Sequence, residues 1–375
     1  MTGTKWAEVD ATVLRDNTRA LRSVSGDGTA VMAMVKANGY GHGAVTAARA
    51  ALGGGATWLG VSSVTEALEL RGAGFDAPIL NVGWTTPAEM AAAVAAGVDV
   101  TVFDPDGVRS ARAGVRAAGR PVRVHWKLDT GMGRLGTRLD ELQPMIDALL
   151  AARPGVVVAG LFTHFAAADA DDLEFTLAQH ARFVETTDTL RERFDDVLLH
   201  AANSPALLRL PATHHDIVRP GIALYGYPPN PAAGVVLRPA MAVRALVTQV
   251  KRMDTGETVG YGREWTAPRP SLVATIAAGY ADGVDRRNRN NGVVIVGGAL
   301  CPVVGRVSMD QFGVDVSAAG AVRSGDVATM IGEADGLSVD ATDVALRIGT
   351  IAYEVLCAVS ARVPRVTVNA EGVIA

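Results

Sequence analysis

The first two thirds of the chain repeat one unit, in which a short apolar run is followed by a longer stretch rich in alanine, leucine and arginine. Most of the apolar runs are nearly continuous and β-branched, as expected for strands buried on both faces. Strands that alternate with helices predict a parallel sheet, and eight repeats favour a closed (β/α)8 barrel over an open sheet. The expected strands are 30–36, 58–62, 78–83, 99–104, 122–129, 156–165, 197–203 and 217–226.

Helices are expected between these strands, and several have clear signals at their ends. Thr86 and Asp104 each precede a proline, which is typical of a helix start. Gly97 and Gly119 follow helical stretches, as glycine commonly does at a helix C-terminus. The expected helices are 44–52, 65–72, 87–96, 105–118, 139–152, 171–194 and 204–210; a strand at 6–10 and a helix at 13–23 precede the first repeat.

The pattern changes after Pro239, where β-rich runs are separated by glycine and charged turns. This indicates a compact β domain with one late helix, at about 340–359. We therefore expect a barrel domain over 1–238 and a smaller, mostly-β C-terminal domain over 239–375. Two domains also suit a chain of 375 residues. The expected strands of the second domain are 242–250, 271–277, 292–296, 303–307, 313–316 and 326–331.

Composition excludes several classes of function. The chain has 35 basic and 39 acidic residues, a balance that favours neither a nucleic-acid nor a membrane partner. No run of 18 apolar residues and no signal-peptide pattern is seen. Cys301 and Cys357 cannot build a disulfide framework, so we expect a reducing, cytoplasmic location.

Lys36 ends the first predicted strand of the barrel, where the chemistry of such folds gathers. Burial at this position would lower the pKa of the amine and favour its neutral form. A neutral amine suits Schiff-base formation with a carbonyl. The alternative is a lysine that extends its amine to solvent and has no role in chemistry.

A dinucleotide-binding loop is a second alternative at this place. The motif Gly39-x-Gly41-x-x-Ala44 matches a relaxed fingerprint, and Glu66 follows at roughly the expected distance. Against it, the loop inserts a tyrosine and a histidine that would crowd a pyrophosphate. The repeat also continues to eight units. We therefore favour the lysine chemistry.

The segment 35–43, Val-Lys-Ala-Asn-Gly-Tyr-Gly-His-Gly, closely resembles the cofactor-lysine signature of bacterial alanine racemases. Further matching segments follow in the same order through both predicted domains. The resemblance implies a fold-type III enzyme that uses pyridoxal 5'-phosphate to interconvert L-alanine and D-alanine, supplies D-alanine for peptidoglycan and works as a homodimer. The segments are 129–136, 163–165, 202–204, 218–226, 260–262, 279–283, 305–311 and 353–355.

The resemblance implies that Lys36 holds the cofactor covalently and that Arg219 faces its pyridine nitrogen. Arginine can only donate hydrogen bonds, so the ring would stay a weaker electron sink and transamination would be suppressed. A structural salt bridge is the alternative for Arg219. For Ser204, a helix N-cap is compatible with phosphate binding. The residues implied for phosphate are Tyr40, Ser204, Gly221, Ile222 and Tyr353.

Racemisation needs a base on each face of the α-carbon. The resemblance names Lys36 for the D enantiomer and Tyr261 for the L enantiomer. Because a free tyrosine has a pKa of about 10, Tyr261 needs a neighbouring group to help it act as a base. His164, beside Arg219, is the candidate for this group. Tyr261 would come from the partner subunit, and so would Tyr280 and Met309, which contact substrate.

Arg134 would bind the substrate carboxylate, since a guanidinium offers two parallel donors. Lys127 matches a lysine that some family members carry in carbamylated form, where it holds the arginine in place. A plain surface arrangement of Lys127 with Asp129 is the alternative. The matching segments also place Asn203 and Asp310 as supporting residues.

Other enzymes and proteins share parts of this pattern. A non-catalytic pyridoxal-phosphate carrier lacks the β domain, and fold-type III decarboxylases have an acidic residue at the position of Arg219 and a cysteine motif where this chain has Ser308. Racemases of serine or of broader specificity share the motifs and stay open. We expect no metal site, and we interpret His214-His215-Asp216 as a solvated turn.

Overall fold

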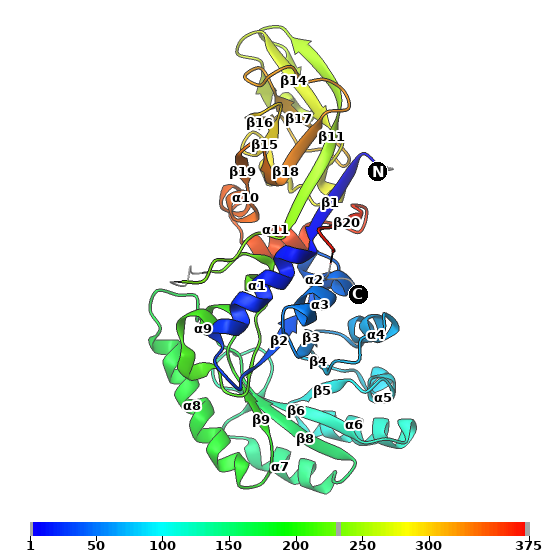
Figure 1. Cartoon of the computed structure of the whole chain (residues 1–375), viewed down its shortest axis with the longest axis vertical. Coiled ribbons are helices and arrows are strands. Elements are labelled where there is room, and N and C mark those ends of the chain that lie inside the picture. Colours follow the sequence, from blue (N-terminus) through cyan, green and yellow to red (C-terminus); the bar gives the residue numbers. More distant parts are fainter. Residues whose placement is uncertain (1–2, 230–233, 372–375) are drawn as a thin grey trace. The chain divides into compact units, whose positions relative to one another are not determined.

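The computed structural model describes residues 3–229 and 234–371, which form two compact units (Figure 1). The barrel unit contains Leu14–Gly39 and Ala44–Arg238. The β-rich unit contains the described chain up to Val13, the short segment Tyr40–Gly43 and the chain from Pro239. No helix in the described part of the chain is both long and apolar enough to cross a bilayer.

The strands of the barrel unit form one parallel sheet in the order β10-β2-β3-β4-β5-β6-β8-β9. The sheet closes because Asp216 N and Arg219 N, which flank β10, donate to Leu199 O within β9 and to Ala202 O just after it. The predicted eight-stranded barrel is therefore confirmed. The strands are β2 (Ala30–Met34), β3 (Trp58–Val61), β4 (Ile79–Asn81), β5 (Asp99–Val102), β6 (Val122–Asp129), β8 (Val156–Phe162), β9 (Leu198–His200) and β10 (Ile217–Val218); β7 (Thr137–Arg138) pairs with β6.

Helices surround this sheet on the outside (Figure 1). Thr86 caps its helix through a reciprocal pair of bonds with Glu89, and Asp104 accepts from Gly107 N at 2.6 Å. Gly119 ends its helix in left-handed backbone, as glycine readily does. The helices are α1 (Ala11–Val24), α3 (Ala44–Gly53), α4 (Val64–Gly72), α5 (Pro87–Ala95), α6 (Pro105–Ala118), α7 (Leu142–Ala151), α8 (Glu174–Arg191) and α9 (Ser204–Arg209).

The N-terminal strand differs from the expected domain division. β1 (Lys5–Asp10) pairs antiparallel with β11 (Met241–Met253) and parallel with β20 (Arg365–Val368), so it belongs to the sheet of the β-rich unit. The expected boundaries placed this strand in the barrel domain. Alternating apolar residues predict a half-buried strand but do not predict which other strand it pairs with.

The β-rich unit is built on one sheet in the order β19-β18-β15-β16-β17-β14-β11-β1-β20. The single helix expected at 340–359 is wrong: α10 (Ala341–Ile348) ends at Gly349 in left-handed backbone, and α11 (Ala352–Ala358) follows. The remaining strands are β14 (Ser271–Ile276), β15 (Val293–Val296), β16 (Ala299–Val304), β17 (Phe312–Asp315), β18 (Val327–Ala334) and β19 (Leu337–Val339), with a hairpin of β12 (Thr258–Val259) and β13 (Trp265–Thr266).

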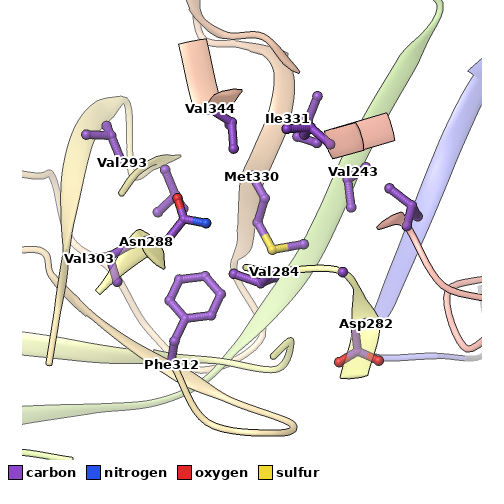
Figure 2. A pocket seen from close by; sticks show the side chains of 14 residues that line it. Val243, Asp282, Val284, Asn288, Val293, Val303, Phe312, Met330, Ile331 and Val344 are labelled. Carbon is purple, nitrogen blue, oxygen red and sulfur yellow. The ribbon is translucent and has the colours of Figure 1, made fainter. Parts of the chain in front are cut away.

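The core of the β-rich unit encloses a cavity of about 50 Å³ (Figure 2). Phe312, Met330 and Val303 point into it, and most of its lining is apolar. Asp282 lies at its edge and pairs with Lys5 Nζ of β1 at 2.7 Å. This ion pair fastens the N-terminal strand to the unit.

Candidate active site

The chain after β2 makes a left-handed turn that begins at Lys36. The expected strand 30–36 stops at Met34, and Ala37, Asn38 and Tyr40 all have φ between 51° and 53°. Left-handed backbone costs an ordinary residue about 1–2 kcal/mol, and such strain gathers at functional sites. The turn presents the half-buried Lys36 at the carboxyl edge of the sheet.

Glu66 and Asn38 hold this turn in place. The Glu66 carboxylate accepts from Ala37 N at 2.6 Å and from Ser62 N at 2.8 Å. Asn38 Oδ1 accepts from Ala44 N, the first residue of α3, at 2.9 Å. Glu66 is thus a structural partner of the lysine turn. This role removes the acid that a dinucleotide site would need.

Arg219 follows β10 and is buried, and it has no carboxylate partner among the described residues. Its guanidinium donates to Thr163 O at 2.7 Å, Ala201 O at 3.1 Å and His200 Nδ1 at 2.9 Å. His164 Nδ1 lies farther away, at 3.4 Å. Burial lowers the pKa of Arg219 to about 9. No ion pair of Arg219 occurs within 3–229 or 234–371, so the alternative of a structural salt bridge is wrong.

Four cations surround His164 at this edge of the barrel. Burial lowers the pKa of His164 well below its ordinary value, and Arg219, Lys127, Arg134 and Lys36 add to the shift. The imidazole is therefore neutral at physiological pH. The cluster brings five predicted site residues together in a strongly positive environment that favours anionic ligands.

Lys127 is almost fully buried, at 4% exposure, so the alternative of a surface arrangement with Asp129 is wrong. Burial, with Arg134 and Arg219 nearby, lowers its pKa to about 8. Asp129 instead accepts from Gly131 N and Gly133 N and so shapes the loop that carries Arg134. A neutral, nucleophilic amine is accessible to Lys127 near neutral pH.

Ser204 ties two segments of the predicted phosphate site together. Its Oγ accepts from Gly221 N at 2.9 Å and from Ala223 N at 3.3 Å. The residue that caps α9 is Asn203, whose Oδ1 accepts from Ala206 N, so the alternative of Ser204 as N-cap is wrong. Ile222 begins a 3-10 helix, Ile222–Tyr225, whose first amides have no acceptor within the helix.

The remaining predicted residues lie in the β-rich unit. The rings of Tyr40 and Tyr353 are 6.2 Å apart, and burial, with Tyr353 as a second cause, raises the pKa of Tyr40. Asp310 accepts from Arg362 Nη2 at 2.7 Å. The two tyrosines therefore form one pair, and Asp310 is fixed separately.

Tyr261, Tyr280 and Met309 are large side chains left exposed, at 72%, 43% and 52%. Tyr280 and Met309 are neighbours because Tyr280 N donates to Ser308 O and Ala281 N to Met309 O. Tyr261 lies between two glycines with φ of 72° and 73°. Exposed aromatic and methionine side chains are typical of protein interfaces.

His200 is a site residue that the sequence did not reveal. It ends β9, and its ring stacks on Phe162 with centroids 4.7 Å apart and planes inclined by 5°. It is the nearer imidazole partner of Arg219, while the sequence pointed to His164. The signal available was its place within the seventh predicted strand, 197–203.

Family models match the chain in two parts. The model described as "Alanine racemase, N-terminal domain" matches residues 9–229, and "Alanine racemase, C-terminal domain" matches residues 240–367. The alanine racemase of Desulforamulus reducens is 41% identical over 368 residues, with 97% of this chain and 99% of that protein covered. That of Symbiobacterium thermophilum is 42% identical, with 96% of each chain covered.

Solved structures are similar over nearly the full length. The alanine racemase of D-cycloserine-producing Streptomyces lavendulae has a TM-score of 0.94 and 39% identity, with 98% of each chain covered. The alanine racemase of Bartonella henselae, solved with covalently bound pyridoxal phosphate, has a TM-score of 0.88 and 27% identity, with 97% of this chain and 100% of that chain covered.

Proposed function

The chain belongs to the alanine racemase family of amino-acid isomerases, and on that premise we propose that it interconverts L-alanine and D-alanine with pyridoxal phosphate held on Lys36. The observation that carries the proposal is the buried Arg219, which offers only donors and whose partners in the described part of the chain are neutral, in one cationic cluster with Lys36. A cytoplasmic location and a role in supplying D-alanine for peptidoglycan belong to the same proposal.

The described residues fit the cofactor. The hydroxyl of Ser204 and the amide of Ile222 offer hydrogen-bond donors to a phosphate at the start of a 3-10 helix, and the amide of Gly221 holds that hydroxyl in place. By resemblance, Gly221 also belongs to the phosphate site. By resemblance, the hydroxyls of Tyr40 and Tyr353 add to this set. When bound, pyridoxal phosphate supplies the electron sink that makes the α-hydrogen of an attached amino acid acidic.

Lys36 and Tyr261 would then carry the proton. Lys36 Nζ removes or returns it on one face of the α-carbon, and Tyr261 Oη does so on the other. Arg219 stays protonated near neutral pH, since its pKa is about 9, and would give a hydrogen bond to the ring nitrogen without giving up its proton. We expect this arrangement to suppress transamination.

Arg134 would bind the substrate carboxylate, and Lys127 would hold Arg134 as a carbamate. The lowered pKa of Lys127 supports this modification, because a neutral amine adds to carbon dioxide and then releases a proton. The product is an anion beside Arg134, where the unmodified lysine would be a second cation. Asn203 would support the cofactor end of the site.

We propose a homodimer whose two sites each combine both chains. The exposure of Tyr261, Tyr280 and Met309 supports this arrangement, because a partner chain would bury them over its own substrate. Asp310 would support this partner-derived side. Each Lys36 would then work with the Tyr261 of the partner.

Chiral product analysis tests the activity. The protein, loaded with pyridoxal phosphate and incubated with L-alanine, should produce D-alanine until the two enantiomers are about equal, and Lys36→Ala should abolish this conversion. A panel with L-serine and larger amino acids separates alanine specificity from broader racemisation. Release of carbon dioxide without D-alanine would contradict the proposal and indicate a decarboxylase.

A further inference from the structure

A row of four hydrogen-bonded polar side chains, which we call the file, runs through the interior of the barrel unit from Arg219 to Asp99. Arg219 Nη1 lies 2.9 Å from His200 Nδ1, His200 Nε2 lies 2.8 Å from His125 Nδ1, and His125 Nε2 lies 3.2 Å from Asp99 Oδ2. Both imidazoles have no solvent exposure, and Asp99 has 6%. Asp99 begins β5, so the file extends from the carboxyl edge of the sheet toward the amino edge.

The arginine at one end and the carboxylate at the other together set the direction of every proton in this file. A guanidinium only donates, so His200 Nδ1 must be the acceptor and carries no proton. A neutral His200 then holds its proton on Nε2 and donates it to His125 Nδ1. His125 in turn holds its proton on Nε2 and donates it to the carboxylate of Asp99. Only one pair of neutral tautomers satisfies all three bonds.

The barrel is shaped around these two rings. His125 pairs in register with Gly160, and a Cβ at Gly160 would lie 2.4 Å from His125 Nδ1. The glycine therefore lets the imidazole cross β8 to reach His200 on β9. Trp58 meets the His125 ring edge-on with centroids 5.6 Å apart. This glycine has no positive φ to explain it, so the space for the ring is its structural reason.

We infer that Asp99, acting through His125, is a positioning residue that holds His200 in its Nε2–H tautomer and thereby keeps its Nδ1 as the acceptor that orients Arg219. A carboxylate that fixes an imidazole tautomer through the far ring nitrogen is a general device of active sites. Asp99 is also the counter-charge that the file links to Arg219, which has no carboxylate of its own in the described chain.

Two variants and one control test this inference. Asp99→Asn keeps the shape of the side chain and removes its charge, and the new amide can accept from His125 or donate to it. His125→Phe keeps a ring of similar size and breaks the file. Arg123→Gln is the control, because Arg123 Nε contacts the same Asp99 oxygen at 3.2 Å from the exposed side.

The first measurement needs neither cofactor nor activity. In the protein without cofactor, ¹⁵N shifts of labelled histidine should show His125 and His200 as Nε2–H tautomers. Asp99→Asn should give a mixture of tautomers at His125, and His125→Phe a mixture at His200, while Arg123→Gln should match the wild type. Unchanged tautomers in both test variants would overturn the inference.

The second measurement rests on the proposed function. In the loaded enzyme, kcat for alanine should fall on the order of tenfold in both test variants, with KM little changed, because the file acts on Arg219 and not on substrate binding. An equal loss in Arg123→Gln would assign the effect to the ion pair at the barrel end and overturn the inference. If the wild type forms no D-alanine, the proposed function fails, while the tautomer measurement still decides the role of Asp99.

Discussion

His215 shows how one side chain of the barrel unit couples pH to stability. Its Nε2 lies 3.0 Å from His180 Nε2, and burial, followed by the effect of His180, lowers its pKa to about 4. The neighbouring His214 is buried, with its ring nitrogens 3.1 Å from Ser25 O and 2.9 Å from Leu207 O. The solvated turn expected for this segment is therefore wrong.

Replacing His215 by asparagine should make the protein less sensitive to acid. A free histidine titrates at about 6.5, so between that pH and about 4 the unfolded chain binds more protons at this position. The stability due to neutral His215 is present above 6.5 and is lost as pH falls toward 4, by up to about 1.4 kcal/mol per pH unit. His215→Asn removes this slope, and asparagine tolerates the φ of 49°.

Urea unfolding at pH 7.5 and pH 5 measures the effect. At pH 7.5 the variant should be less stable by about 1 kcal/mol, the contribution of one hydrogen bond. At pH 5 the difference should shrink or reverse. The same difference at both pH values would show that His215 does not titrate as described.

At the scale of elements, variants of the left-handed turn after β2 can separate the contribution of the cap on α3 from the cost of left-handed backbone. Asn38→Gly keeps left-handed backbone accessible but removes the cap on α3, and it should lower the free energy of unfolding by about 1 kcal/mol. Asn38→Ala removes the cap and adds the penalty of left-handed backbone, so this variant should lower the free energy of unfolding by about 1 kcal/mol more than Asn38→Gly does. Ala37→Gly is the control, since it relieves the backbone without touching the cap. Equal losses in the two Asn38 variants, measured by chemical denaturation, would contradict this account.

Hydrophobic periodicity predicted the order and type of the barrel elements, because strands buried on both faces give continuous apolar runs. Hydrophobic periodicity failed to predict the ends of elements where the local backbone conformation, rather than burial, ends a strand or a helix. The run 217–226 is apolar except for Arg219, yet Pro220 and Gly221 divert the chain, and only Ile217–Val218 pairs as a strand. The helix expected at 340–359 breaks at Gly349, and the strand before Lys36 gives way to the left-handed turn.

The candidate site was predictable where its residues form linear motifs at strand ends, as with Lys36 and Arg219. The file of side chains behind Arg219 could not be predicted from the sequence. His125 and His200 are solitary histidines 75 positions apart, and their contact depends on the register of three strands and on the space above Gly160. Sequence alone predicts the strand that holds each histidine but not which side chains face each other across the barrel.

At the scale of the whole molecule, the two proposed bases belong to different units: Lys36 to the barrel unit and Tyr261 to the β-rich unit. Tyr261 is also the most exposed of the aromatic residues assigned to the site. In a symmetric dimer each chain can lend its tyrosine to the other, so that both sites are completed at once. An inactive lysine variant and an inactive tyrosine variant should then rescue each other.

Co-expression of Lys36→Ala with Tyr261→Phe, each on a chain with its own tag, tests this exchange. In a mixed dimer with shared sites, one site has lost both bases and the other retains both. Random pairing makes about half of the dimers mixed, so the preparation should recover about a quarter of the wild-type activity per chain. Each variant expressed alone should be inactive, and the doubly tagged dimer isolated from the mixture should have about half the wild-type activity. If each site instead takes both bases from one chain, every site in the mixture lacks one base, and no activity returns in the doubly tagged dimer.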